Sequence, residues 1–223
     1  MNTLATEHLQ HCVWDFNGTI LDDLWVTVES INALMRERGM RQISVDEHRR
    51  RFRFPVSDYY TDLGFDLSHE SFGSLSDEYH ERYMGKLDRC GMYEGIETVM
   101  GLLAQKGVRQ YVLSAMHEPT LIQCCDALGI TGYFDAVYGL ADFLARSKAD
   151  RGRSLCEDFG ISPGTSLYIG DTEHDMDVAD ELGLTPVAAT WGHQAPGMFD
   201  AGAVTLAVTP QELVEAIENC CSN

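Results

Sequence analysis

The residues best suited to chemistry in this sequence are carboxylates that lie next to short apolar runs. Asp15 lies near the end of the run CVWDF (12–16). Asp171 directly follows SLYIG (166–170), and Asp175 comes four residues later. Carboxylate oxygens in such places suit Mg²⁺, which takes a few carboxylates together with water and phosphate oxygens. An Asp after a strand is also a common helix N-cap, so the residues alone leave Asp171 open between a cap and a metal ligand.

Two further residues have the chemistry to hold a phosphate group. Ser114 follows the apolar run YVL and precedes Pro119, which suits the first turn of a helix. A hydroxyl and backbone amides at a strand end can bind phosphate. Lys148 is one of only three lysines and begins a helical stretch, where its charge opposes the helix dipole. Taken alone, Ser114 is more simply explained as a loop or cap serine, and Lys148 as a solvated surface group.

The segment VWDFNGTILDD (13–23) contains Asn17-Gly18, a dipeptide typical of a hairpin turn. The residues that follow do not alternate as a second strand would. Leu24, Val28 and Ile31 recur at helical spacing instead, so we expect a strand, a loop and then a helix.

Strand-like and helical stretches alternate through most of the chain. Apolar runs at 111–115, 136–140, 166–171 and 185–190 alternate with helical stretches near 94–106, 119–129, 147–159 and 174–183. This order predicts a Rossmann-like α/β/α core, a mostly parallel sheet between two layers of helices. Ligands of such sheets bind beyond the carboxyl ends of the strands, where Asp15, Ser114 and Asp171 are expected.

Residues 22–90 interrupt the alternation and read as helices only. The first helix is expected to end near Gly39, the pattern Ser44-x-x-Glu47 is a capping box, and further helices are expected near 57–64 and 68–87. We therefore predict a helical cap domain at 22–90 inserted into a core formed by 1–21 and 91–223. The glycines of CGMYEG (90–95) would suit a hinge at the boundary.

Composition excludes several classes of function. The 223 residues include 35 acidic and 16 basic side chains, a formal charge of −19, which disfavours binding to nucleic acid or to anionic membranes. No apolar run approaches the ~20 residues that cross a bilayer, and the first residues lack the features of a signal peptide. The seven cysteines have no zinc-ligand spacing, so we expect reduced thiols in a cytoplasmic protein.

Taken together, the motifs have the order Asp-x-Asn-Gly-Thr, Ser, Lys and Gly-Asp-x-x-x-Asp. This order resembles the haloacid dehalogenase superfamily, which consists mostly of Mg²⁺-dependent phosphatases, and in particular its phosphoglycolate phosphatase-like members with a helical cap. The resemblance implies that Asp15 is a nucleophile that forms an aspartyl-phosphate. It also implies that Thr19 and Ser114 bind the phosphoryl oxygens and that Lys148 neutralises their charge.

The same resemblance implies the metal ligands. Mg²⁺ would be held by the carboxylates of Asp15 and Asp171 and by the backbone carbonyl of Asn17, with Asp175 as a ligand or as a support behind the ligands. We expect an intracellular phosphomonoester hydrolase that acts on a small anionic phosphorylated metabolite, with the cap closing over the substrate. No nucleic acid, membrane or obligate protein partner is expected.

Asn17 departs from the family pattern, in which a second Asp at this position protonates the leaving group and then activates water. An amide cannot take the proton, and general acid–base help is worth about 10²–10⁴-fold, or roughly 3–6 kcal/mol. Four interpretations stay open: a natural phosphatase for substrates with good leaving groups, a substitution made to trap a complex, another proton donor such as His117 or His174, and a phosphate-binding pseudoenzyme. A phosphotransferase is a further alternative.

The cap segment is rich in arginine. Seven of the 13 arginines lie between residues 36 and 53, which is a marked bias in an acidic protein. Arg53, just before FPV in an expected loop, is the candidate to bind an anionic substrate. For the other arginines, pairing with nearby carboxylates such as Asp46 and Glu47 is the simpler interpretation.

Overall fold

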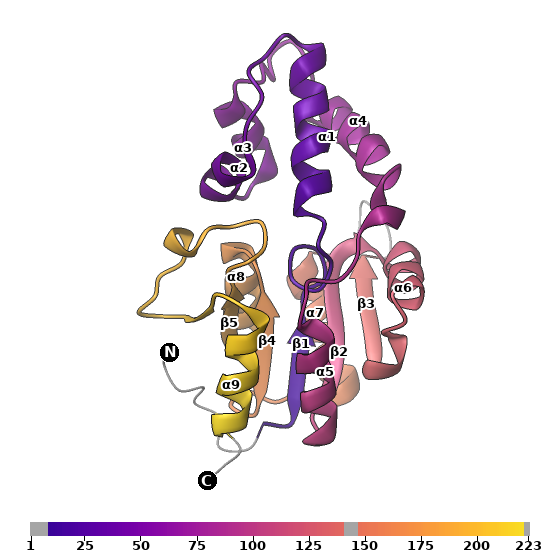
Figure 1. Ribbon diagram of the computed structural model, residues 1–223, viewed down its shortest axis with the longest axis vertical. Helices are drawn as coiled ribbons and strands as arrows, with labels where there is room; N and C mark the ends of the chain where they lie inside the picture. The colour runs from indigo at the N-terminus through magenta and orange to yellow at the C-terminus, as the bar shows by residue number, and fades with distance from the viewer. Residues whose placement is uncertain (1–8, 141–146, 221–223) are drawn as a thin grey trace.

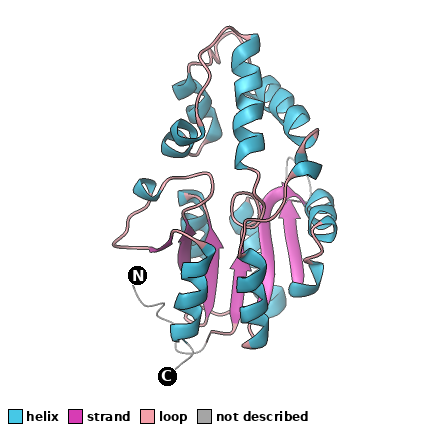
Figure 2. Ribbon diagram, viewed as in Figure 1, coloured by secondary structure: helices cyan, strands magenta, loops and turns pink. Residues whose placement is uncertain are grey.

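The computed structural model describes residues 9–140 and 147–220, and its centre is a six-stranded parallel sheet (Figures 1 and 2). The order across the sheet is β3-β2-β1-β4-β5-β6. The direction of winding reverses between β1 and β4, and in such sheets this switch point opens a crevice beyond the strand ends. The strands are β1 His11–Trp14, β2 Arg109–His117, β3 Ala136–Leu140, β4 Ser166–Gly170, β5 Thr185–Ala189 and β6 Thr205–Ala207.

Helices cover both faces of the sheet, so the predicted three-layer architecture is confirmed. One face packs against α5 (Ile96–Gln105), α6 (Glu118–Ala127) and α9 (Pro210–Cys220), and the other against α7 (Lys148–Phe159) and α8 (Glu173–Leu182). Side chains of a strand alternate between faces. Accordingly, Cys12 and Trp14 join the first cluster and Val13 joins the second.

Four helices between β1 and α5 form a separate body over the carboxyl ends of the strands (Figure 1). They have an apolar cluster of their own, built around side chains such as Leu34, Tyr59 and Leu75. The capping box of Ser44 and Glu47 is present. The helices are α1 Leu24–Glu37, α2 Val45–Arg51, α3 Val56–Leu63 and α4 Phe72–Met84, and the short helix η1 Leu87–Arg89 leads back to the sheet. A helical insert at this place in the chain was predicted. The boundaries of this insert at residues 22 and 90 remain a proposal.

Two features differ from the sequence-based expectation. Strand β2 does not end at Ser114 but continues to His117, with a register irregularity after Leu113. The backbone amide of Met116 donates to the Ser114 hydroxyl at 3.1 Å, which fits a break in the regular ladder at this point. The second feature is the pair formed by β6 and α9. The strand has only three residues, too few for a recognisable apolar run.

None of the described helices has the length and apolar character needed to cross a bilayer. Among the described residues the free cysteines are Cys12, Cys90, Cys124, Cys125 and Cys156.

Candidate active site

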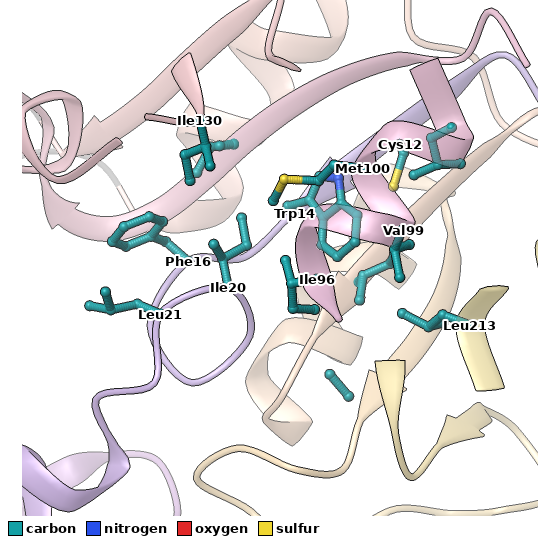
Figure 3. Close-up of a cluster of buried hydrophobic side chains, with 14 of the residues drawn as sticks. Cys12, Trp14, Phe16, Ile20, Leu21, Ile96, Val99, Met100, Ile130 and Leu213 are labelled. Carbon is teal, nitrogen blue, oxygen red and sulfur yellow. The ribbon is translucent and has the colours of Figure 1, made fainter. Parts of the chain in front are cut away.

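The loop after β1 is held by apolar side chains that alternate with polar ones. Phe16, Ile20 and Leu21 are at most 1% exposed and join the core cluster (Figure 3). The carbonyl of Phe16 accepts hydrogen bonds from the amides of Thr19, Ile20 and Leu21. This compact turn places Asp15 and Thr19 in the crevice, where both are buried.

Asp15 directly follows β1, beside the end of β4. Its amide donates to the carbonyl of Ile169 at 2.8 Å, which continues the pairing of the two strands by one residue. Its side chain contacts the ammonium of Lys148, the first residue of α7. The same ammonium lies 2.6 Å from Asp175 Oδ1. The structure thus brings together Asp15, Lys148 and Asp175, three residues predicted from separate motifs.

Asp171 is not the N-cap of the helix that follows it. The N-cap of α8 is Thr172, which forms a capping box with Asp175, so the capping interpretation of Asp171 is wrong. Asp171 Oδ1 accepts from the Thr19 hydroxyl at 3.2 Å, and Oδ2 accepts from the His193 amide at 2.6 Å. Its carboxylate therefore points into the crevice toward the loop after β1.

Asp15, Asp171 and Asp175 form a buried acidic cluster whose ligand atoms lie within 4.8 Å of one another. Burial raises the pKa of Asp15 to about 7, against the opposing effect of the Lys148 ammonium. Burial likewise raises the pKa of Asp171 to about 8, against the opposing effect of His193. Burial works against ionisation of Asp175 as well, but Lys148 still holds the pKa of Asp175 below its usual value.

This cluster suits a divalent cation. Lys148 contacts two of the three buried carboxylates, those of Asp15 and Asp175. A further positive charge would therefore offset both the desolvation and the mutual repulsion of the carboxylates. The donors are hard oxygens, which match Mg²⁺. Both oxygens of Asp175 already have partners, Lys148 on one side and Thr172 on the other, and both oxygens of Asp171 likewise accept hydrogen bonds, from Thr19 and His193.

Ser114 and Asn17 meet across the crevice. Ser114 is 1% exposed, and its hydroxyl donates to Asn17 Oδ1 at 3.5 Å. Ser114 thus faces the loop after β1, and its binding of phosphoryl oxygens stays a prediction.

A second polar network, which the sequence analysis missed, surrounds Asp23. The side chain of Asp23 is buried at the start of α1 and accepts from Asn17 Nδ2 at 3.0 Å and from the Tyr83 hydroxyl of α4 at 2.6 Å. His193, on the loop after β5, lies 3.1 Å away through Nε2. Although burial alone would lower it, the Asp23 carboxylate raises the pKa of His193 to about 9.

The cap and the core also meet at the loop after β5. The Arg49 side chain donates to the carbonyls of Thr190 and Gly192, and its own carbonyl accepts from the amide of Ala195. His48 Nε2 lies 3.3 Å from His193 Nδ1. Arg49 therefore joins the cap to the core.

Three predicted candidates have other neighbours. Arg53 pairs with Asp62 at 2.9 Å, and its side chain is about half exposed. The ring of His174 lies 4.7 Å from the ring of Phe54 on the cap. His117, the N-cap of α6, lies 3.4 Å from the Thr120 hydroxyl.

One sequence signal could have indicated His193. It lies four residues after β5, at the same edge of the sheet as Asp15 and Asp171. No comparable signal marks Asp23 or Tyr83, because their contact joins residues 60 positions apart.

Comparison with known proteins supports the assignment made from the motifs. The family model of haloacid dehalogenase-like hydrolases matches residues 12–189. A phosphoglycolate phosphatase of Synechococcus elongatus is 22% identical over 210 residues, which cover 94% of this chain and 97% of that protein.

Solved structures agree in fold. A predicted phosphatase from Clostridium acetobutylicum superposes with a TM-score of 0.77 at 20% identity, covering 95% of this chain and 99% of the other. Protein Tyrosine Kinase A of Mycobacterium tuberculosis superposes with a TM-score of 0.78 at 24% identity, again covering 95% and 99%. The predicted family is confirmed: the chain belongs to the haloacid dehalogenase-like hydrolases and resembles the phosphoglycolate phosphatases among them.

Proposed function

We propose that the protein is a Mg²⁺-dependent phosphomonoester hydrolase that acts on a small anionic phosphorylated metabolite. The observation that carries this proposal is the buried contact of Asp15 with Lys148 beside Asp171, at the switch point of the sheet. Phosphoglycolate is the first substrate to test, because relatives along nearly the whole chain carry the name phosphoglycolate phosphatase.

Asp15 is the nucleophile in this proposal. One carboxylate oxygen forms a bond to phosphorus, the bond from phosphorus to the ester oxygen breaks, and the leaving group departs with that electron pair as an oxyanion, which takes a proton from solvent. Water then attacks the phosphorus of the aspartyl-phosphate, the bond from phosphorus to the Asp15 oxygen breaks, and the phosphate leaves with the protons of the water while the carboxylate of Asp15 is restored. These two displacements replace one difficult step. In the first displacement the attacking oxygen is that of Asp15, and in the second it is that of water.

The side chains around Asp15 bind the phosphoryl group. Thr19 and Ser114 donate hydroxyl hydrogens to its oxygens, and Lys148 places a positive charge beside Asp15 and the transferring group. Asp175 keeps the ammonium in place through its 2.6 Å contact. These groups are held before substrate arrives, since each lies in a buried and hydrogen-bonded position.

The cation site consists of Asp15, Asp171 and the backbone carbonyl of Asn17, with Asp175 behind them. Bound Mg²⁺ would offset the negative charge of the carboxylates and of the phosphoryl oxygens. Burial, with the neighbouring charges of Asp15 and Asp175 as a smaller cause, raises the pKa of Asp171. Without the cation, the same negative charges would also repel an approaching phosphate.

Asn17 narrows the class of substrate. Its amide can orient a leaving group or a water molecule but cannot donate a proton to an alkoxide. We therefore expect faster turnover of aryl and acyl phosphates, whose leaving groups depart as stable anions, than of alkyl phosphates. This corresponds to a natural phosphatase with weak acid–base help.

The cap comprises residues 22–90 in this proposal, with 1–21 and 91–223 as the core. Arg49, His48 and Tyr83 hold the cap against the loops that carry the site. The cap must therefore open to admit substrate and close to exclude water. Arg53 is the proposed anion-binding residue of the cap.

The test is release of inorganic phosphate from p-nitrophenyl phosphate and phosphoglycolate, with and without Mg²⁺. Wild type and Asp177→Asn, a change at an exposed position of α8, should release phosphate only when Mg²⁺ is present. Asp15→Asn should be inactive on both substrates. Equal rates for wild type and Asp15→Asn would refute the assignment of the nucleophile.

A further inference from the structure

Asp23 is the most completely bonded carboxylate near the site, and the proposed reaction gives it no role. The residue is buried, with an exposed fraction of 1%. Oδ1 accepts from the amide of Gly18 at 2.8 Å and faces His193 Nε2 at 3.1 Å. Oδ2 accepts from Asn17 Nδ2 and from the Tyr83 hydroxyl.

These contacts define the direction of the hydrogen bonds at residue 17. Asn17 Nδ2 has two hydrogens, and it donates to Asp23 Oδ2 at 3.0 Å and to the Tyr83 oxygen at 2.7 Å. The Tyr83 hydroxyl has one hydrogen and donates it to Asp23. All three hydrogens in this triangle are therefore used, and they all point toward Asp23 or toward its partner.

A carboxylate at position 17 cannot take the place of the amide. It has no hydrogen to give, so its oxygen would face Asp23 Oδ2 at about hydrogen-bond distance without a proton between them. Two like charges this close inside a buried site repel strongly, and Asp23 and Tyr83 would each lose a donor.

We propose that Asp23 is a positioning residue for Asn17, and that carboxylates at positions 17 and 23 exclude one another in this site. The inference deepens the proposed phosphatase function and rests on it, because it explains why an amide occupies the place of an acid–base group. Residue 17 is neutral here because the negative charge of this loop resides on Asp23.

Tyr83 extends the same relationship to the cap. It lies in α4, whereas Asn17 and Asp23 both lie in the connection from β1 to α1. The amide of Asn17 thus has its full set of partners only while α4 lies over the loop. The position of the cap and the orientation of residue 17 are coupled through this hydroxyl.

The experiment is a double-mutant cycle of wild type, Asn17→Asp, Asp23→Asn and the combined variant, all as full-length chains. Thermal unfolding and kcat and KM on p-nitrophenyl phosphate are measured for each with saturating Mg²⁺. Asn17→Asp alone should unfold at a lower temperature and should not exceed the kcat of wild type. In the Asp23→Asn background the same change should raise kcat at least about 10-fold with little change in KM, because an unopposed Asp can transfer the proton.

The matched control is Asn17→Asp combined with Asp22→Asn. This pair removes one negative charge from the neighbouring residue, which makes no hydrogen bond to Asn17 among the described contacts. The added Asp22→Asn change should leave the kcat and the unfolding temperature of Asn17→Asp unchanged. This result would show that the rescue by Asp23→Asn comes from the specific contact between positions 17 and 23 and not from the lower negative charge of the loop.

The inference is overturned if Asn17→Asp alone speeds turnover, or if its effects on kcat and on unfolding temperature are the same in both backgrounds. It is also overturned if the combined variant folds no better than Asn17→Asp. If wild type releases no phosphate from any substrate, the proposed function fails, and the unfolding temperatures of the cycle still decide whether positions 17 and 23 exclude two carboxylates.

Discussion

The ammonium of Lys148 lies 2.6 Å from Asp175 Oδ1 while it also contacts Asp15, so one buried lysine serves two carboxylates. Asp175 is in turn held by the amide and hydroxyl of Thr172, the N-cap of α8. The residues at the start of α8 therefore hold the Lys148 ammonium, at the start of α7, beside the proposed nucleophile Asp15.

Asp175→Asn should lower kcat more than it raises KM. The amide keeps the size of the side chain but removes the charge that holds Lys148, and a small displacement of a catalytic group reduces rates about 10–100-fold. Steady-state kinetics at saturating Mg²⁺ measure the effect, with Asp177→Asn as the control on the exposed face of the same helix. A kcat equal to that of wild type would contradict the positioning role.

Gly18→Ala should abolish activity, whereas Gly129→Ala should not. Both glycines have a positive φ, of 76° and 72°, so both substitutions carry a similar backbone strain of about 1–2 kcal/mol. A Cβ at Gly18 would come 2.2 Å from Asp171 Oδ2, while a Cβ at Gly129 meets nothing within 4 Å. Phosphate release and urea unfolding separate the two effects. Similar loss of activity in both variants would show that strain alone is responsible.

The protein treated with EDTA should lose stability as pH rises from 5 to 9. The pKa values of Asp15 and Asp171 are raised to about 7 and about 8, so the folded state binds more protons than the unfolded state between pH 4 and 8. His193, whose pKa is raised to about 9, acts in the same direction above pH 6.5. The free energy of unfolding therefore falls with pH, by roughly 1.4 kcal/mol per unit for each fully shifted group.

Thermal unfolding across this pH range checks the sign. Mg²⁺ should raise the unfolding temperature more at pH 8 than at pH 5, because the cation competes with protons for the same oxygens. Asp171→Asn should flatten the pH dependence of the metal-free protein. A stability that increases from pH 5 to 8 would count against the buried acidic cluster as described.

Arg53→Ala should raise KM for an anionic substrate by about 10-fold and leave kcat nearly unchanged, since one charge-assisted hydrogen bond contributes about 1.5–3 kcal/mol. Binding would require the guanidinium to exchange Asp62 for the substrate. Arg50→Ala, an exposed change nearby, serves as the control. If Arg53→Ala and Arg50→Ala have the same KM as wild type, Arg53 is a surface residue that pairs with Asp62.

Much of the site could be predicted from the sequence because parallel strands bring their carboxyl ends to one edge. Asp15, Ser114 and Asp171 each follow an apolar run, and Lys148 begins the helix that comes after β3, so this helix starts at the same edge. The apolar runs in the sequence, together with the shared carboxyl edge of parallel strands, were sufficient to predict that these residues lie close together. The capping box of Ser44 was predictable for a similar reason, since its partners are three residues apart.

The tertiary structure alone decided the surroundings of Asn17. Its contacts join the loop after β1 to Tyr83 in α4 and, through Asp23, to His193 after β5, over separations of 66 and 170 residues. No periodicity or motif encodes such contacts, because they depend on how the helical insert packs over the sheet. The sequence determined a haloacid dehalogenase-like scaffold with a proposed nucleophile at Asp15. The packing of the cap onto that scaffold determined that the amide of Asn17 has Asp23 as its partner.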